Sequence, residues 1–255
     1  MAKPLARWHD LRQFTPARVA LGRAGNGVPT AAHLAFQSAH AAARDAVHAA
    51  LDVAALQDAL AVAGIDSIAV RSAAADRHTY LLRPDLGRRL CDADRALLPM
   101  APNAMVFVVC DGLSAIAVQR HAAALLSHIV PALQATRPVA PVVIATQGRV
   151  ALGDDIGGIM GGAAVAVLIG ERPGLSAADS LGIYLTWQPR PGRSDAERNC
   201  ISNVRPAGLP IPQAAAKLAW LIEAMHQLGL TGIGLKDDQH AVVPMSAATR
   251  EGSRT

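Results

Sequence analysis

Aromatic residues are scarce, making up only 3% of the 255 residues, and positive charge is modest, with a formal net charge of +4. Proteins that bind single-stranded nucleic acids stack bases on aromatic side chains along a basic groove. The chain also lacks any run of five or six like charges. These absences argue against a nucleic-acid partner. The arginines supply most of the positive charge. We expect them to lie on a solvated surface or on a surface that contacts an acidic protein.

Cysteine is also rare, and Cys91, Cys110 and Cys200 are too far apart to form a C-x-x-C pair. This spacing predicts neither a zinc site nor a disulfide framework, and it fits a reducing compartment. The N-terminus has no apolar core of a signal peptide, and no apolar run approaches the ~20 residues needed to span a bilayer. We therefore predict a soluble intracellular protein with no metal ligands and no membrane partner.

The residues that are abundant predict a packed α/β protein. Hydrophobic residues make up 51% of the chain and charged residues 17%, enough for a sizeable core. Apolar strand patterns alternate with helical ones, which is typical of a Rossmann-like, mostly parallel sheet with helices on both faces. We expect strands at 65–72, 104–112, 163–171 and 182–187, and a strand followed by a turn at 141–150. We expect helices from Thr30, at 52–63, 83–98, 114–135 and 212–229, and a short helix or turn at 153–162.

This pattern predicts three segments. Residues 1–64 form an N-terminal helical segment, residues 65–235 form the α/β domain, and residues 236–255 form a polar, mobile tail.

Three polar strand exits stand out: CDGLS (110–114), TQGRV (146–150) and GERPG (170–174). In parallel sheets, ligands bind outside the carboxyl ends of the strands, so these exits should share one rim. Glu171 directly follows a buried strand, where its carboxylate needs hydrogen-bond donors. Arg172 is a poor donor for it, because adjacent strand residues point in opposite directions. A ligand with amide N–H groups would satisfy Glu171, and an intramolecular partner remains an alternative.

Other chemistries find weaker support. The chain has no G-x-S-x-G elbow and no Walker sequence, and Ser114 is better placed as a helix N-cap than as a nucleophile. Asp154 and Asp155 would point about 100° apart on a helix, which favours a charged helix N-terminus over a magnesium site. Cys200 is either a reactive thiol or a small residue that lets a flat ligand approach, and the second is favoured.

Several stretches together resemble one family, the small subunit of ethanolamine ammonia-lyase. The resemblance covers roughly residues 12–235, and its two most specific motifs are GERPGL and NCISN. The stretches that carry it are 14–30, 34–48, 80–90, 110–115, 147–157, 168–192 and 195–210.

The resemblance implies a carbon–nitrogen lyase that uses adenosylcobalamin to convert ethanolamine to acetaldehyde and ammonia by a radical route. It implies that the substrate site belongs to a large subunit, a barrel protein, so this chain would contribute no catalytic residue. It would instead help to hold the corrinoid at the interface of a hetero-oligomer. Matched to the family's motifs, the cofactor-binding residues are Val150, Glu171 and Cys200. Glu171 would accept hydrogen bonds from corrin amides, Val150 would make an apolar or backbone contact, and Cys200 would allow close approach.

A motif that many corrinoid proteins use, D-x-H-x-x-G, supplies a histidine that displaces the cofactor's own base from cobalt. The sequence has two D-x-H segments, at 76–78 and 238–240, but Leu81 and Val243 stand where the glycine would be. We therefore expect the dimethylbenzimidazole base to stay on cobalt, with no protein ligand from this chain.

Some members of the family carry a longer N-terminal extension that is associated with packaging into a protein-shelled microcompartment. Its shortness here favours the cytoplasm, with microcompartment packaging as the alternative. Two other functions stay open: a stand-alone nucleotide- or phosphate-binding α/β enzyme, and a noncatalytic corrinoid-binding protein. Only the lyase subunit requires a stoichiometric large-subunit partner.

Overall fold

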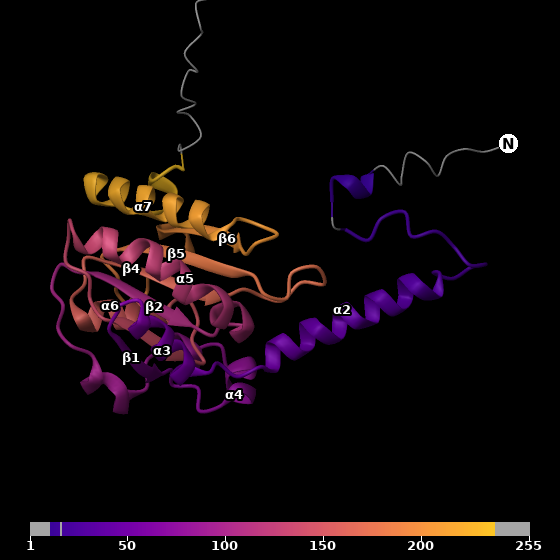
Figure 1. The fold of residues 1–255 in the computed structure, drawn as a ribbon. Helices are drawn as coiled ribbons and strands as arrows, with labels where there is room; N and C mark the ends of the chain where they lie inside the picture. The colour runs from indigo at the N-terminus through magenta and orange to yellow at the C-terminus, as the bar shows by residue number, and fades with distance from the viewer. Residues whose placement is uncertain (1–10, 16, 238–255) are drawn as a thin grey trace, which may run out of the picture.

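The protein is an α/β structure built on one six-stranded sheet (Figure 1). The structure is a computed structural model that describes residues 11–15 and 17–237, so the predicted tail lies almost wholly outside the described residues. The strand order is β1-β3-β2-β4-β5-β6. The strands are β1 Ser67–Arg71, β2 Met105–Cys110, β3 Val142–Thr146, β4 Ala164–Gly170, β5 Leu181–Trp187 and β6 Arg198–Val204. The first four strands in this order run parallel and β5 runs antiparallel to both neighbours, so the predicted mostly parallel sheet is confirmed.

Helices cover the two faces unequally. Apolar side chains of α3, α5 and α7 pack on one face of the sheet, and those of α6 pack on the other. Figure 1 shows α2 extending away from the body, and Ala46 is its only buried residue. The helices are α2 Thr30–His48, α3 Val53–Val62, α4 Arg77–Leu82, α5 Ala115–Gln134, α6 Leu152–Met160 and α7 Ile211–Leu228. The described residues also form five short 3-10 helices: η1 Leu11–Gln13, η2 Leu86–Arg88, η3 Asp92–Leu97, η4 Asp195–Glu197 and η5 Gly232–Gly234.

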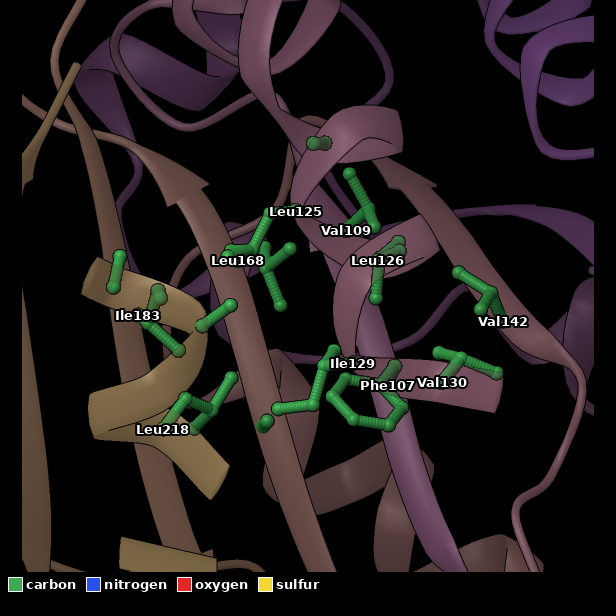
Figure 2. Packing of buried hydrophobic residues seen from close by; sticks show 14 of the residues in the cluster. Phe107, Val109, Leu125, Leu126, Ile129, Val130, Val142, Leu168, Ile183 and Leu218 are labelled. Atoms are coloured by element: carbon green, nitrogen blue, oxygen red, sulfur yellow. The ribbon is translucent and has the colours of Figure 1, made fainter. Parts of the chain in front are cut away.

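The central strands are apolar throughout because both of their faces are buried. On β2, Phe107 and Val109 pack toward α5, while Val106 and Val108 pack toward α6. Figure 2 shows the first of these layers, in which Phe107 lies below Ile129 of α5. In the described part of the chain, no helix is both long and apolar enough to cross a membrane.

Side-chain caps fix where several helices begin. The Ser114 hydroxyl accepts a hydrogen bond from the Ala117 N–H at 3.3 Å, which confirms the predicted N-cap of α5. Asp52 caps α3 in the same way, through the Ala55 N–H at 3.0 Å. The helix expected from Thr30 begins at that residue, and the N-cap position is taken by Pro29, without a side-chain hydrogen bond.

Two further predictions differ from the structure. The helix expected at 83–98 is instead η2 and η3, because Leu90 between them bridges to Ser72 and donates its N–H to Asp155 at 2.8 Å. Strand β6 was missed because it lies at the sheet edge and only Ile201 and Val204 of its apolar residues enter the core. Its alternating pattern is therefore weak.

Candidate functional site at the carboxyl edge of the sheet

The three polar strand exits share one edge, as predicted. Strands β2, β3 and β4 run parallel, and the last residue of β2, Cys110, pairs with Ala145 and Ile169 near the ends of its neighbours. The loops after these strands therefore emerge side by side. The β5 residue Leu181 pairs with Gly170, so the start of β5 lies at the same edge.

The crevice between the ends of β2 and β3 is occupied by an arginine. The following helices, α5 and α6, pack on opposite faces, and ligands of open α/β sheets bind at such a point. Here Arg77 donates to the carbonyl oxygens of Gly112 at 2.8 Å and Val47 at 2.7 Å. Beside it, the Asp111 carboxylate accepts the Gly148 N–H at 3.1 Å. Burial raises the pKa of Asp111, and Arg77 and the backbone N–H groups oppose that rise.

Tyr80 forms the link from this crevice to the loop after β3. Two guanidinium groups pack on its ring: Cζ of Arg77 lies 4.7 Å from the ring centroid, and Cζ of Arg149 lies 4.6 Å from it. The Tyr80 hydroxyl donates to the Gly148 carbonyl at 3.2 Å, and Arg149 donates to the Tyr80 carbonyl at 3.2 Å. Burial raises the pKa of Tyr80 to about 12, so the phenol keeps its proton. These contacts hold the loop that contains Val150 in one position.

Glu171 folds back over the neighbouring strand. Its Oε2 accepts hydrogen bonds from the Ser180 hydroxyl and from the Asn203 N–H, the latter at 3.2 Å. A Cβ on Gly182 would lie 3.0 Å from Glu171 Oε1, so a larger residue there would make the carboxylate shift. The structure thus gives Glu171 intramolecular partners other than Arg172. Among the described residues no donor reaches Oε1, which remains free to accept from a ligand.

Cys200 lies directly opposite Tyr184 in the β5–β6 pair. Both side chains lie on the α6 face of the sheet, since Ile183 and Ile201 on the same strands point into the core under α5 and α7. Tyr184 packs against the smaller core on its own face. Cys200 is exposed and Tyr184 is half-buried. Burial, with the nearby Cys200 and Glu171 adding to it, raises the pKa of Tyr184 to about 12.

The pKa of the Cys200 thiol is raised above its ordinary value, chiefly because neighbouring protein atoms restrict its hydration. A raised thiol pKa lowers the fraction of nucleophilic thiolate. This counts against the reactive-thiol role of Cys200, and its role in allowing close approach of a ligand stays a prediction.

A cleft of about 780 Å³ adjoins this face. Val150 and Arg149 line it from the loop after β3, and Tyr184 lines it from β5. Tyr184 is therefore the residue that joins the three predicted positions: it shares the cleft with Val150, faces Cys200 across the strand pair, and lies near Glu171.

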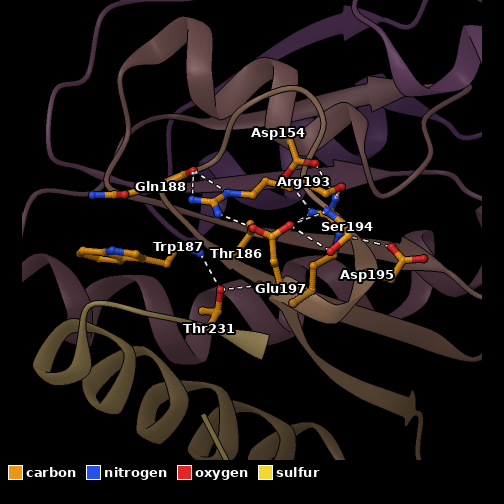
Figure 3. A network of polar contacts seen from close by, with 10 residues as sticks. Asp154, Thr186, Trp187, Gln188, Arg193, Ser194, Asp195, Glu197 and Thr231 are labelled. Atoms are coloured by element: carbon orange, nitrogen blue, oxygen red, sulfur yellow. Dashed lines mark hydrogen bonds and ion pairs between the residues drawn. The ribbon is translucent and has the colours of Figure 1, made fainter. Parts of the chain in front are cut away.

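A buried polar network fixes the far wall of the cleft (Figure 3). Arg198 donates to both oxygens of Asp154, at 2.7 and 2.6 Å, and to the Thr186 hydroxyl at 2.9 Å. Burial raises the pKa of Asp154, and its bonds to Arg198 oppose this. Arg193 pairs with Glu197 in the same loop. This network holds the 189–198 segment against α6.

The adjacent carboxylates of α6 serve different partners. Asp154 is bound by Arg198, while Asp155 accepts the Leu90 N–H and lies 3.3 Å from Arg95 Nη2. Both lie in the first turn of α6 and point apart, as predicted. In residues 11–15 and 17–237 no group of three His, Cys, Asp or Glu side chains could hold a metal ion.

Tyr184 and the arginines of the cleft were not predicted from the sequence. The alternation in GIYLTW offered a signal, since it places Tyr184 on the opposite face from Ile183 and Leu185. The arginines gave no signal, because they come from segments far apart in the chain.

The family model described as "Ethanolamine ammonia-lyase light chain (EutC)" matches residues 5–236. The chain belongs to this family. The resemblance inferred from the motifs is thereby confirmed.

Three bacterial relatives, each named "Ethanolamine ammonia-lyase small subunit", show how close the similarity is. The chain is 53% identical to the Xanthomonas campestris pv. campestris (strain B100) protein over 243 residues, which is 92% of this chain and 89% of the relative. It is 54% identical to the Azotobacter vinelandii protein over 239 residues, 91% and 88% of the two chains. It is 53% identical to the Bradyrhizobium diazoefficiens protein over 245 residues, 94% of each chain.

Proposed function

We propose that this chain is the small subunit of an adenosylcobalamin-dependent ethanolamine ammonia-lyase, which converts ethanolamine to acetaldehyde and ammonia. The observation that carries the proposal is membership of the light-chain family over residues 5–236. When bound, adenosylcobalamin supplies the radical chemistry of the reaction. The protein supplies binding, orientation and exclusion of side reactions.

The residues at the carboxyl edge fit a corrinoid. A corrin is broad and flat, and its rim carries amide side chains. Glu171 Oε1, which no described donor reaches, can accept hydrogen bonds from such amides. Its other oxygen is held by Ser180 and Asn203, so the carboxylate is already oriented before any ligand binds.

The open face of β5 and β6 suits a flat ligand. Cys200 and Ser202 are small and exposed on this face, so a broad group can approach the strand pair closely. Val150, half-buried at the cleft, offers apolar contact, and the Tyr80 contacts keep its loop in place. Cys200 remains a thiol there, without reacting.

We further propose that this chain gives no ligand to cobalt and that the cofactor's own base stays on the metal. His78, the histidine of one D-x-H segment, is exposed on α4 and does not line the cleft. The second segment, at 238–240, lies outside the described residues. An electron paramagnetic resonance spectrum of the cob(II)alamin state should show nitrogen coupling from dimethylbenzimidazole. Coupling that moves to ¹⁵N-histidine of this chain would overturn the proposal.

Substrate binding belongs, in this proposal, to a large subunit with which the chain forms a hetero-oligomer. In this proposal the chain contributes no catalytic residue, and Val150, Glu171 and Cys200 contact the cofactor. The chain therefore acts by completing and shielding the cofactor site, and activity requires both subunits.

The test is co-expression with the large subunit encoded in the same organism, followed by purification on a tag carried by this chain. We expect a stoichiometric complex that releases acetaldehyde from ethanolamine only when adenosylcobalamin is added. Each component omitted in turn is the control. An untagged large subunit that fails to co-purify, or full activity without this chain, would overturn the proposal.

A further inference from the structure

The cleft beside Val150 is lined by more cationic than anionic side chains. Six arginines and three aspartates line it, so its walls carry a net positive charge. The arginines are Arg88, Arg89, Arg95, Arg149, Arg193 and Arg198.

Three of these arginines already have carboxylate partners and act as parts of the wall. They are Arg95 with Asp155, Arg193 with Glu197, and Arg198 with Asp154. Their charges are balanced within the fold.

The remaining three, Arg88, Arg89 and Arg149, have no carboxylate within 4.0 Å in the described part of the chain. Arg88 and Arg89 are exposed at η2. The guanidinium of Arg149 packs on the Tyr80 ring, and its Nε is buried without a hydrogen-bond partner among the described residues. Placing three guanidinium groups without an ion-pair partner around one cavity is unfavourable, because like charges repel and the buried Arg149 Nε is left unpaired.

An anion in the cleft would remove both costs. The planar fork of arginine matches the oxygens of a phosphate group and donates two hydrogen bonds at once. Val150 and Ala151, just before α6, also line the cleft, and the peptide dipoles at the start of that helix add positive potential there. With one wall formed by Tyr184, the cleft joins directly to the face that carries Cys200.

We propose that Arg88, Arg89 and Arg149 bind a phosphate ester in this cleft. This rests on the proposed function, because the nucleotide tail of adenosylcobalamin contains one phosphodiester. The cleft would hold that phosphate, while Glu171 and Cys200 contact the corrin. A free nucleotide offers the same chemistry, so the test separates these two sources.

The experiment compares two corrinoids that differ in the nucleotide tail. Adenosylcobalamin carries the phosphodiester, whereas adenosylcobinamide lacks it. Each corrinoid is titrated into the complex of this chain with its large subunit, and binding is followed by visible spectroscopy. This chain has either the wild-type sequence or the substitutions Arg88→Ala/Arg89→Ala. The control is Arg44→Ala/Arg120→Ala, which removes the same charge from exposed positions outside the cleft. All four side chains are on the surface, so folding should be little affected.

We expect the Arg88→Ala/Arg89→Ala complex to bind adenosylcobalamin at least about tenfold more weakly, the loss typical of a hydrogen bond to a charged group. Its affinity for adenosylcobinamide, and both affinities of the control, should stay unchanged. Equal weakening for both corrinoids, or none, would contradict a cofactor phosphate in the cleft.

Calorimetry with AMP distinguishes the second source. If AMP binds and the Arg88→Ala/Arg89→Ala substitutions abolish binding, while neither corrinoid binds, the phosphate site stands and the proposed function fails. If both corrinoids bind regardless of the substitutions and AMP does not bind, the phosphate site is overturned and the proposed function stands.

Discussion

Glu171→Gln isolates the part of Glu171 that faces a ligand. In the structure, Oε2 accepts from the Ser180 hydroxyl and the Asn203 N–H. A glutamine must place its carbonyl oxygen there to keep both bonds, because its NH₂ group cannot accept. The NH₂ group then replaces Oε1 and presents a donor where corrin amides would also donate.

The expected cost falls on binding rather than on folding. A hydrogen bond to a charged acceptor is worth about 1.5–3 kcal/mol, so losing it should weaken adenosylcobalamin binding by about 10- to 100-fold. The internal bonds survive, so the free energy of unfolding should change by less than about 1 kcal/mol. Glu171→Ala loses the internal bonds as well and should also lower stability.

The assay is a spectroscopic titration of the complex with adenosylcobalamin, alongside urea unfolding of this chain. Glu223→Gln is the matched control, because Glu223 is an exposed carboxylate on α7, on the other face of the sheet, and pairs with Arg137. Wild-type affinity in Glu171→Gln would refute the role given to Oε1. Equal weakening by Glu223→Gln would show that the effect reflects net charge alone.

Three further predictions test the polar contacts and the packing that surround the site. Asp154→Asn should destabilise the fold by up to about 3–5 kcal/mol in urea unfolding, because the buried Arg198 charge then keeps only the exposed Asp195 as a carboxylate partner, 3.4 Å away. A loss below about 1 kcal/mol would show that the Asp154–Arg198 pair is dispensable. Hydrogen bonds from Ser194 and Arg193 lower the pKa of Glu197 to about 2, below its ordinary 4.5. Since the pKa is lower in the folded state, the ionised Glu197 stabilises the fold above about pH 4.5, and this stabilisation is lost as the pH falls toward 2. The melting temperature of Glu197→Gln should therefore fall less steeply with acid than that of the wild type. Identical pH dependence of the two melting temperatures would contradict this role. Gly182→Ala should displace the Glu171 carboxylate, because the added methyl group would lie 3.0 Å from Oε1. Cofactor affinity should fall while the melting temperature changes little. Unchanged affinity would count against the packing described.

The sheet and its polar edge were predictable because the buried strands are continuous apolar runs. The segments around Phe107, Ile144 and Leu168 have no polar interruptions, and the polar exits follow each of them directly. Parallel strands then require those exits to share an edge. Local patterns were therefore enough to bring Val150 and Glu171 to one side of the molecule.

The rest of the site depends on tertiary contacts that local patterns do not contain. Strand β6 exists because it pairs with β5, and this pairing places Cys200 opposite Tyr184. The segment at 83–98 has helical composition, but the Asp155 carboxylate binds the Leu90 N–H and interrupts a helix there. Arg77 fills the β2–β3 crevice from a short helix, a contact that spacing alone could not reveal.

Hydrogen exchange tests most directly whether the carboxyl edge of this chain forms part of an adenosylcobalamin site. It is measured on the complex with the large subunit, with and without adenosylcobalamin. We predict slower exchange on cofactor addition in peptides covering 147–151 and 199–204, with no change in α7 on the opposite face. Unchanged exchange at both segments in a complex that binds the cofactor would contradict a cofactor site at this edge.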